Sequence, residues 1–222
     1  MASSDENKPK TAEDYLRIEL KPSDLERMNL PSEFWRAKVA DIANEKLRKV
    51  IARCLLHIRK VVANNKGLLL YGPPGSGKTL IATMIAKEAR SWKFTVFYMM
   101  VWELRECIRS RIPFDEQTSI MDRCREVDVL VLDGIAEEDL DEKLVNLRSI
   151  EQLVAYRGQR GRVTFLTTRF TDKELQTNTK LKSFVLGTRS HLHHLQVEGG
   201  VKKSRQKKDI LRSLLLTEGE ED

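Results

Sequence analysis

Eight consecutive residues form a pattern that can hold a phosphate group. Their glycines let the backbone turn sharply, so that several N–H groups can point at one phosphate. Lys78 can reach the β- and γ-phosphates of a nucleotide, and the hydroxyl of Thr79 can ligate Mg²⁺. The motif matches GxxxxGK[ST] in full and predicts a P-loop that binds ATP, with the next residue, Leu80, beside the nucleotide. The eight residues are Gly72, Pro73, Pro74, Gly75, Ser76, Gly77, Lys78 and Thr79.

A second candidate is an aspartate that follows an apolar run. The run at 129–132 predicts a buried strand, and Asp133 comes directly after it. Such a strand delivers its carboxylate to the carboxyl end of a sheet, beside the P-loop. There Asp133 would hold Mg²⁺, together with Thr79. The two motifs together predict a site for ATP and Mg²⁺.

Strands and helices must alternate along the chain to bring these residues together. The P-loop follows an apolar strand at 68–71 and precedes a helix at 78–91. Alternation of this kind predicts an α/β fold with a central parallel sheet and helices on both faces. One long amphipathic helix is expected over 41–64, ended by Gly67, and Ser32 could cap a short helix. Further strands are expected at 95–99, 127–132, 163–168 and 195–197, and further helices at 101–111, 116–124, 144–156, from 172, from 181 and at 203–216.

The composition narrows the class of protein. The chain has 222 residues and a net charge of +6, which is compatible with a nucleic-acid partner. No apolar run of about 18 residues occurs, so no membrane span is expected. The polar residues 1–10 lack the apolar core of a secretory signal, and three widely spaced cysteines suggest a reducing compartment, so a cytoplasmic location is expected. A basic run lies at 202–208, and an acidic tail lies at 217–222.

Beyond the P-loop and the strand that ends in Asp133, which looks like a Walker B strand, the chain resembles the AAA+ ATPases. It is most similar to the DnaC, DnaI and IstB group of helicase loaders and transposase partners. The matching segments are 29–34, 133–138 and 164–168. The resemblance implies a P-loop NTPase (AAA+) three-layer sandwich over 29–216. A short helical N-terminal extension, 1–28, would precede it.

The resemblance also implies roles for single residues. Arg189 looks like the arginine finger, which acts on ATP held by a neighbouring subunit and therefore implies a homo-oligomer. A guanidinium suits this role because it is always charged and its fork can meet two phosphate oxygens. Arg205 lies near the sensor-2 arginine, which contacts the γ-phosphate in the same subunit. Glu138 matches a further glutamate of the family, and either Glu138 or Glu137 could act in hydrolysis.

Two departures from the family pattern concern hydrolysis. The acidic residue that usually follows the Walker B aspartate, and orients the attacking water, is Gly134 here. The position of the sensor-1 asparagine holds Arg169, or Thr168 if the alignment shifts by one. We therefore expect complete nucleotide binding but slow hydrolysis.

A replicative helicase and single-stranded DNA are the partners that the resemblance implies. Segment 101–124, with Arg105, Arg109 and Arg111, lies where this group carries an extra helix used on DNA. With the run at 202–208 it could bind a DNA backbone, although these charges could equally be solvated helix faces. His191, His193 and His194 could suggest a metal site, but structural roles are the stronger interpretation.

Three functions stay open at this point. The leading one is an ATP-dependent helicase loader, whose nucleotide state controls assembly and engagement of DNA and helicase. The second is a transposase-assisting ATPase of the IstB kind. The third is a nucleotide-gated binding module with little hydrolysis, which Gly134 and Arg169 favour.

Overall fold

A computed structural model describes residues 20–109, 114–140 and 146–198. Five strands of this part form one sheet in the order β2-β3-β4-β1-β5, and every neighbouring pair is parallel. The strand order confirms the predicted parallel α/β fold. The strands are β1 Gly67–Tyr71, β2 Val96–Met100, β3 Val129–Ile135, β4 Val163–Thr168 and β5 Leu192–Gln196.

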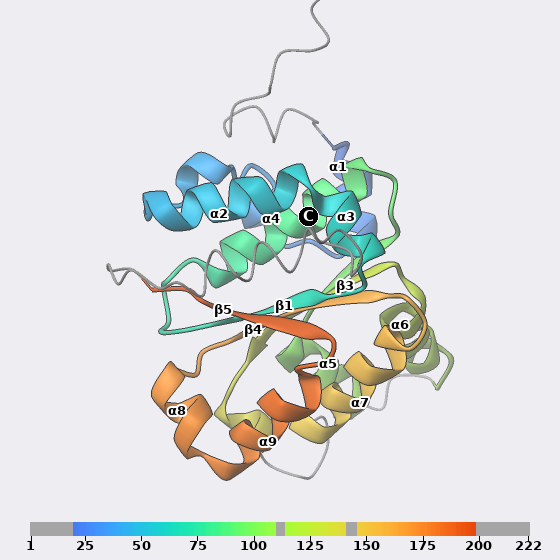
Figure 1. The fold of residues 1–222 in the computed structure, drawn as a ribbon. Coiled ribbons are helices and arrows are strands. Elements are labelled where there is room, and N and C mark those ends of the chain that lie inside the picture. The colour runs from blue at the N-terminus through green and yellow to red at the C-terminus, as the bar shows by residue number, and fades with distance from the viewer. Residues whose placement is uncertain (1–19, 110–113, 141–145, 199–222) are drawn as a thin grey trace, which may run out of the picture.

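Helices cover both faces of the sheet, which gives the three expected layers (Figure 1). One face carries α1 Pro22–Arg27, α2 Glu45–Leu56, α3 Ile58–Ala63 and α4 Lys78–Ser91. The other face carries α5 Val101–Arg109, α7 Leu147–Gly158, α8 Asp172–Thr177 and α9 Thr179–Thr188, while α6 Phe114–Glu126 packs beside α7. A hydrophobic core lies on each side of the sheet. Residues 203–216, where a last helix was expected, lie outside the described residues, as do the basic run and the acidic tail.

The prediction of one helix over 41–64 was wrong. A 3-10 turn at Val39–Asp41 comes first, and α2 begins only after Asn44, whose side chain caps it by accepting the N–H of Leu47 at 3.0 Å. The helix stops at His57, where φ is −110° and ψ is 23°, and α3 follows. After this break Ile58, Val61 and Val62 of α3 are all buried and pack into the hydrophobic core.

The short helix near residue 32 also differs from the prediction. It is a 3-10 helix, Ser32–Phe34, and its N-cap is Pro31 rather than Ser32. The N–H of Phe34 bonds the carbonyl of Pro31 at 3.0 Å, and no side chain caps the turn. Lys87 of α4 holds the chain that follows, because its buried ammonium donates to the carbonyls of Phe34, Trp35 and Ala37 at 2.6–3.3 Å.

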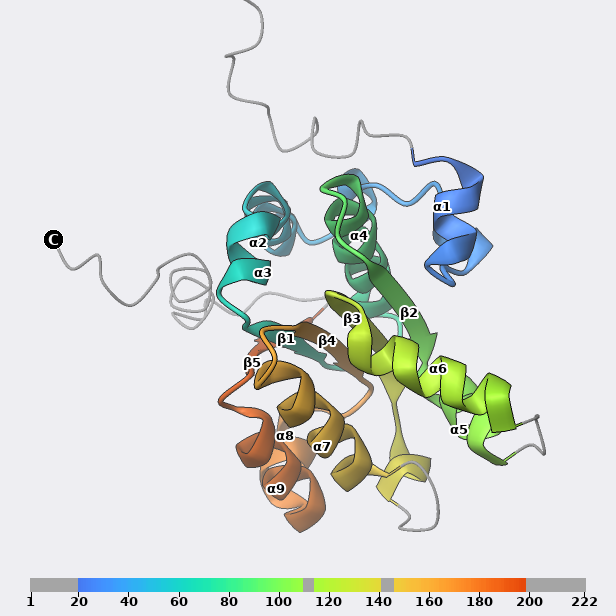
Figure 2. The same cartoon turned by 90° about the vertical axis from the view of Figure 1, so that its right-hand side faces the viewer.

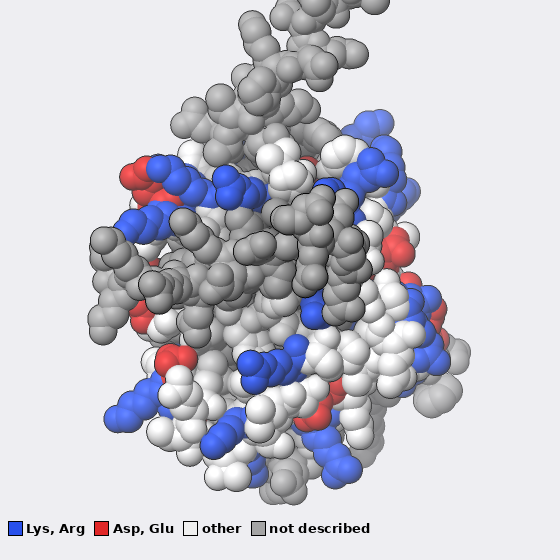
Figure 3. Space-filling model, in the orientation of Figure 1, with Lys and Arg blue, Asp and Glu red and all other residues white. Residues whose placement is uncertain are grey.

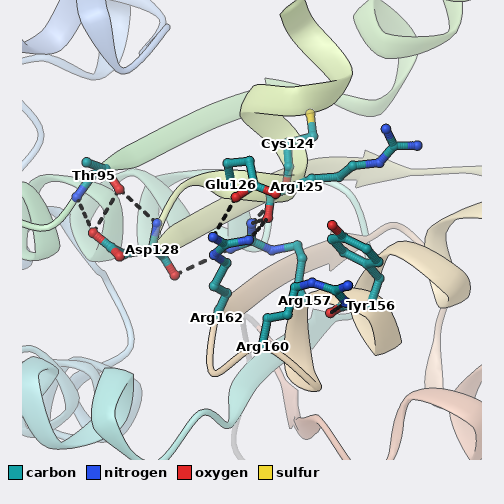
Figure 4. A network of polar contacts seen from close by, with 9 residues as sticks. All are labelled: Thr95, Cys124, Arg125, Glu126, Asp128, Tyr156, Arg157, Arg160 and Arg162. Atoms are coloured by element: carbon teal, nitrogen blue, oxygen red, sulfur yellow. Dashed lines mark hydrogen bonds and ion pairs between the residues drawn. The ribbon is translucent and has the colours of Figure 1, made fainter. Parts of the chain in front are cut away.

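One buried arginine joins the amino ends of the central strands to α6 (Figure 4). Arg157 of α7 is fully buried. Its guanidinium donates to the carbonyl of Cys124 at 2.7 Å and the carbonyl of Val163 at 2.8 Å, and its Nε donates to the hydroxyl of Thr164 at 2.9 Å. Burial lowers the pKa of Arg157 to about 10. The guanidinium thus satisfies carbonyls in the last turn of α6 and holds the amino end of β4, at the end of the sheet opposite the P-loop.

Candidate nucleotide site

The loop 72–77 connects the buried strand β1 to the amino end of α4, as predicted. Gly72, Gly75 and Gly77 all have positive φ, between 74° and 135°, a region that favours glycine. At Gly72 space matters as well, because a Cβ would lie 2.4 Å from the carbonyl oxygen of Val197. The turn, with the helix N-terminus behind it, provides the cradle of N–H groups that an anionic phosphate needs.

Lys78 lies folded into this loop. Its ammonium donates to the carbonyls of Gly72 at 2.8 Å and Pro73 at 2.7 Å, and to the hydroxyl of Ser76 at 3.1 Å. Burial lowers the pKa of Lys78, and the negative charge of Asp133 opposes that shift. The ammonium is therefore held by three bonds to its own loop. A nucleotide would exchange these bonds for bonds to phosphate oxygens.

Asp133 lies at the carboxyl side of the sheet and is 5% exposed. Its Oδ1 accepts the hydroxyl of Thr79 at 3.3 Å and also accepts the hydroxyl of Thr167. Its Oδ2 accepts the hydroxyl of Tyr98 at 2.6 Å. The structure thus brings the predicted pair Thr79 and Asp133 together, and three hydroxyls hold the carboxylate.

Sequence reasoning missed two of these three partners. Thr167 is the residue of β4 whose side chain reaches Asp133. The hydroxyl of Thr168 instead bonds the carbonyl of Ile135 at 2.9 Å, and Arg169 is exposed. Thr167 is thus the residue of this stretch that bonds Asp133, and the assignment of the sensor position to Arg169 or Thr168 stays a prediction. Arg169 still lies near the P-loop, since its charge contributes to lowering the pKa of Lys78.

Gly134 marks an irregularity in the site strand. Its φ is +87°, and the pairing of β3 with β4 shifts between Leu132 and Ile135. The N–H of Gly134 donates to the hydroxyl of Thr167 at 2.8 Å. A Cβ at Gly134 would meet nothing within 4 Å, so only the backbone conformation disfavours a larger residue.

The acidic residues after Gly134 divide into two kinds. Glu137 and Glu138, the predicted candidates for hydrolysis, are exposed in a 3-10 turn, Glu137–Leu140. Asp139 is fully buried; it accepts the N–H of Ala136 at 2.8 Å and pairs with Arg105 at 2.9 Å. Asp139 is therefore committed to folding this turn, which leaves the two glutamates available to solvent.

The other predicted site residues lie elsewhere. Arg189 is exposed at the C-cap of α9, three residues before β5. β5 runs parallel to β1 with Tyr71 opposite Gln196, so Arg189 and the P-loop lie at opposite ends of these strands. Arg205 lies outside the described residues.

The predicted DNA segment requires one revision. The guanidinium of Arg105 is held by Asp139, and its side chain is only 17% exposed, so it is not a free surface cation. Arg109 ends α5, and Arg111 lies outside the described residues. Figure 3 shows Lys and Arg side chains in blue over α2, where Lys46, Lys49 and Arg53 are exposed.

The three histidines lie at or just before β5. Burial lowers the pKa of His191, of His193 and of His194. In the described ranges, no group of three or more His, Cys, Asp or Glu residues could hold a metal ion. None of the helices in those ranges is both long and apolar enough to cross a membrane.

Residues 26–209 match the family described as IstB-like ATP binding proteins. The chain belongs to this family. As an IstB-like protein it carries the ATP-binding domain that the P-loop predicted.

Solved structures share the fold of this IstB-like protein. DnaI superposes with a TM-score of 0.62 at 23% identity, covering 77% of this chain and 96% of that one. A putative primosome component from Streptococcus pyogenes serotype M3 superposes with a TM-score of 0.62 at 22% identity, covering 83% of this chain and 100% of that one. The DnaC helicase loader superposes with a TM-score of 0.61 at 20% identity, covering 76% of this chain and 100% of that one.

Curated relatives match only a short part of the chain. The 26S proteasome regulatory subunit 7 of Dictyostelium discoideum is 52% identical over 48 residues, which are 20% of this chain and 11% of that protein. Protein SAV of Sulfolobus acidocaldarius is 33% identical over 87 residues, which are 36% of this chain and 11% of that protein. The matched segments span about a tenth of the length of these relatives.

Proposed function

We propose that this protein acts in DNA replication as a helicase loader, in which bound ATP promotes assembly and engagement of single-stranded DNA and a replicative helicase. Hydrolysis or nucleotide exchange then releases the partner. The observation that carries the proposal is the separation of Arg189 from the P-loop of its own subunit. Arg189 and the P-loop lie at opposite ends of the sheet, separated by about the length of the five-residue strand β5, which is roughly 17 Å. Arg189 therefore suits the ATP of a neighbouring subunit, in a homo-oligomer.

Mg²⁺ fits the residues beside the P-loop. Thr79 and Asp133 offer a hydroxyl and a carboxylate whose oxygens lie 3.3 Å apart, and Mg²⁺ prefers oxygen ligands. When bound with ATP, the ion would neutralise charge on the phosphates. Thr79 and Asp133 would hold it, and Lys78 would bind the β- and γ-phosphates.

Slow hydrolysis is part of the proposal. Gly134 supplies no carboxylate next to Asp133, and Asp139 is occupied by Arg105 and the N–H of Ala136. Only the exposed Glu137 and Glu138 remain in this turn to orient a water. Slow hydrolysis would let the nucleotide state persist long enough to time the release of a partner.

DNA and helicase as partners have indirect support. The net charge of +6 favours a polyanion. Among proteins of this fold, one is described as the DnaC helicase loader. Another is DnaA bound to AMPPCP and single-stranded DNA, which superposes with a TM-score of 0.56 at 16% identity over 83% of this chain and 57% of that one.

We propose 29–216 as the ATPase domain, 1–28 as an extension, 217–222 as an acidic tail, Arg205 as a γ-phosphate contact and the cytoplasm as the location.

A transposase-assisting ATPase is the second candidate, and the match to IstB-like proteins favours it. Copurification of untagged partners from the native host, in ATP and in ADP, separates the candidates. We expect a replicative helicase to copurify in ATP and not with Lys78→Ala. Recovery of a transposase instead would establish the second candidate. Nucleotide binding with neither partner, in either state, would leave a nucleotide-gated module and contradict the loader.

A further inference from the structure

Tyr98 contacts the candidate nucleotide site although it belongs to none of the motifs. It lies in β2, an edge strand of the described sheet, and its side chain is fully buried. Its hydroxyl donates to Oδ2 of Asp133 at 2.6 Å. A carboxylate oxygen can only accept, so the phenol O–H is the donor of this bond.

The hydroxyls on Asp133 are not equivalent with respect to Mg²⁺. The contact from Thr79 is long, at 3.3 Å, and this hydroxyl is the one that turns to the ion in the proposed site. Tyr98 and Thr167 have no such second role, so they fix the carboxylate in both states. A hydrogen bond to a charged group is about twice as strong as a neutral one. Loss of the bond from either Tyr98 or Thr167 would therefore leave the carboxylate of Asp133 less firmly held.

The main chain of Tyr98 is bound by a different part of the molecule. Its N–H donates to the carbonyl of Met28 at 2.8 Å, and its carbonyl accepts Nδ2 of Asn29 at 3.0 Å. These two residues end the segment that begins with α1. The edge strand is therefore covered, at this one residue, by the end of the segment that begins with α1 (Figure 2).

Two further contacts tie α1 to the same region. Asp24 accepts a bond from Arg90 of α4 at 2.7 Å, and the carbonyl of Arg27 accepts one from Arg123 of α6 at 2.6 Å. The ring of Phe97, next to Tyr98, lies 4.0 Å from the guanidinium of Arg123. A displacement of α1 would thus act on β2 at Tyr98 and its neighbour.

We propose that Tyr98 is a positioning residue, which links the segment α1–Asn29 to Asp133 and makes the affinity for Mg²⁺-nucleotide depend on how that segment is seated. The inference rests on the proposed role of Asp133 at Mg²⁺. A partner that moves α1 would loosen Asp133 through Tyr98. Conversely, Mg²⁺-nucleotide would strengthen the seating of α1, because such a link is reciprocal.

The test compares nucleotide affinity with Mg²⁺ and with EDTA in the full chain, using a fluorescent ATP analogue. Tyr98→Phe keeps the ring and both main-chain bonds but removes the hydroxyl. We expect the gain in affinity due to Mg²⁺ to fall about 5- to 10-fold, with affinity in EDTA unchanged. A folded variant with the wild-type gain would overturn the proposal.

Asn29→Gly tests the other half of the link. Glycine accepts the φ of 58° at this position, so the variant removes only the bond to the carbonyl of Tyr98. We expect the Mg²⁺ gain to fall about 2- to 3-fold. This variant also decides the matter if Tyr98→Phe does not fold, because an unchanged gain then contradicts the link.

Two controls separate the possible failures. Tyr156→Phe removes a phenol hydroxyl on α7, which takes no part in the contacts of Asp133, and should leave the Mg²⁺ gain intact. Asp133→Asn should abolish the gain. If it does and Tyr98→Phe does not reduce it, only the positioning role fails. If Asp133→Asn also has no effect, the proposed Mg²⁺ site itself is wrong.

Discussion

At the scale of single residues, the ammonium of Lys78 bonds three oxygens of its own loop and, in the proposed site, would bond the phosphates of ATP. Lys78→Ala removes the ammonium that phosphates would meet, so ATP affinity should fall at least about tenfold. It also removes the donor that three oxygens of the loop share, so the thermal midpoint should drop slightly. Nucleotide titration and thermal unfolding measure both effects. Lys46→Ala, on the exposed face of α2, is the control, and equal affinity in the two variants would refute the P-loop assignment.

Gly134 connects backbone geometry to turnover. Any residue with a Cβ should lose about 1–2 kcal/mol of stability at its φ of +87°. Gly134→Ala and Gly134→Glu share this strain, and only the second adds a carboxylate. We expect steady-state ATP turnover to be higher in Gly134→Glu than in Gly134→Ala. Equal turnover would show that a missing carboxylate is not what limits hydrolysis.

The residues of the site were predictable from the sequence to different degrees. The P-loop and Asp133 were identified because each lies within a local pattern, a glycine-rich turn or an apolar strand. Tyr98 and Thr167 gave no such signal, since their contacts with Asp133 depend on the order of strands in the sheet. A threonine late in a predicted strand was the only hint of Thr167.

At the scale of elements, Arg157 decides how α6 and the central strands meet. Arg157→Lys keeps the charge but cannot span the carbonyls of Cys124 and Val163 and the hydroxyl of Thr164. We expect the free energy of unfolding to fall by about 2–5 kcal/mol in urea denaturation. Arg160→Lys, on an exposed residue nearby, should change it by less than about 0.5 kcal/mol. Equal losses would contradict the structural role.

The elements themselves were predicted in kind but not in extent. Hydrophobic periodicity indicated helical chain within 41–64, but it could not show that α2 begins only after its cap, Asn44, or that it stops at His57. The strand expected at 195–197 begins at Leu192 instead. Its start was missed because His193 and His194 are polar and only two of the five strand residues are buried. Hydrophobic periodicity indicates which face of an element is buried, but it does not indicate at which residue a helix or strand begins.

At the scale of the whole molecule, Arg189 makes the proposed assembly depend on ATP. The guanidinium would meet a γ-phosphate of the neighbour, a charge that ADP lacks. Arg189→Ala should keep ATP binding within each subunit and lose the ATP-dependent part of oligomer formation. Sedimentation in ATP and in ADP measures this. A monomer in both states, with DNA present, would contradict a shared site.

A mixture of variants tests the same geometry. In a mixed interface, Lys78→Ala subunits still offer Arg189, and Arg189→Ala subunits still bind ATP. Partial recovery of assembly is therefore expected in the mixture and in neither variant alone. Absence of recovery at equal concentrations would contradict an arginine supplied by the neighbour.

The covering of β2 by Met28 and Asn29 also bears on solubility. An edge strand with free N–H and C=O groups is a template for strand addition by another chain, and β2 is apolar throughout, Val-Phe-Tyr-Met-Met. Met28 and Asn29 occupy the N–H and carbonyl at its centre. Substitutions that release this segment should therefore promote aggregation in any nucleotide state, and light scattering would detect it without ATP. The segment from α1 to Asn29 would thus protect the sheet from strand-by-strand polymerisation.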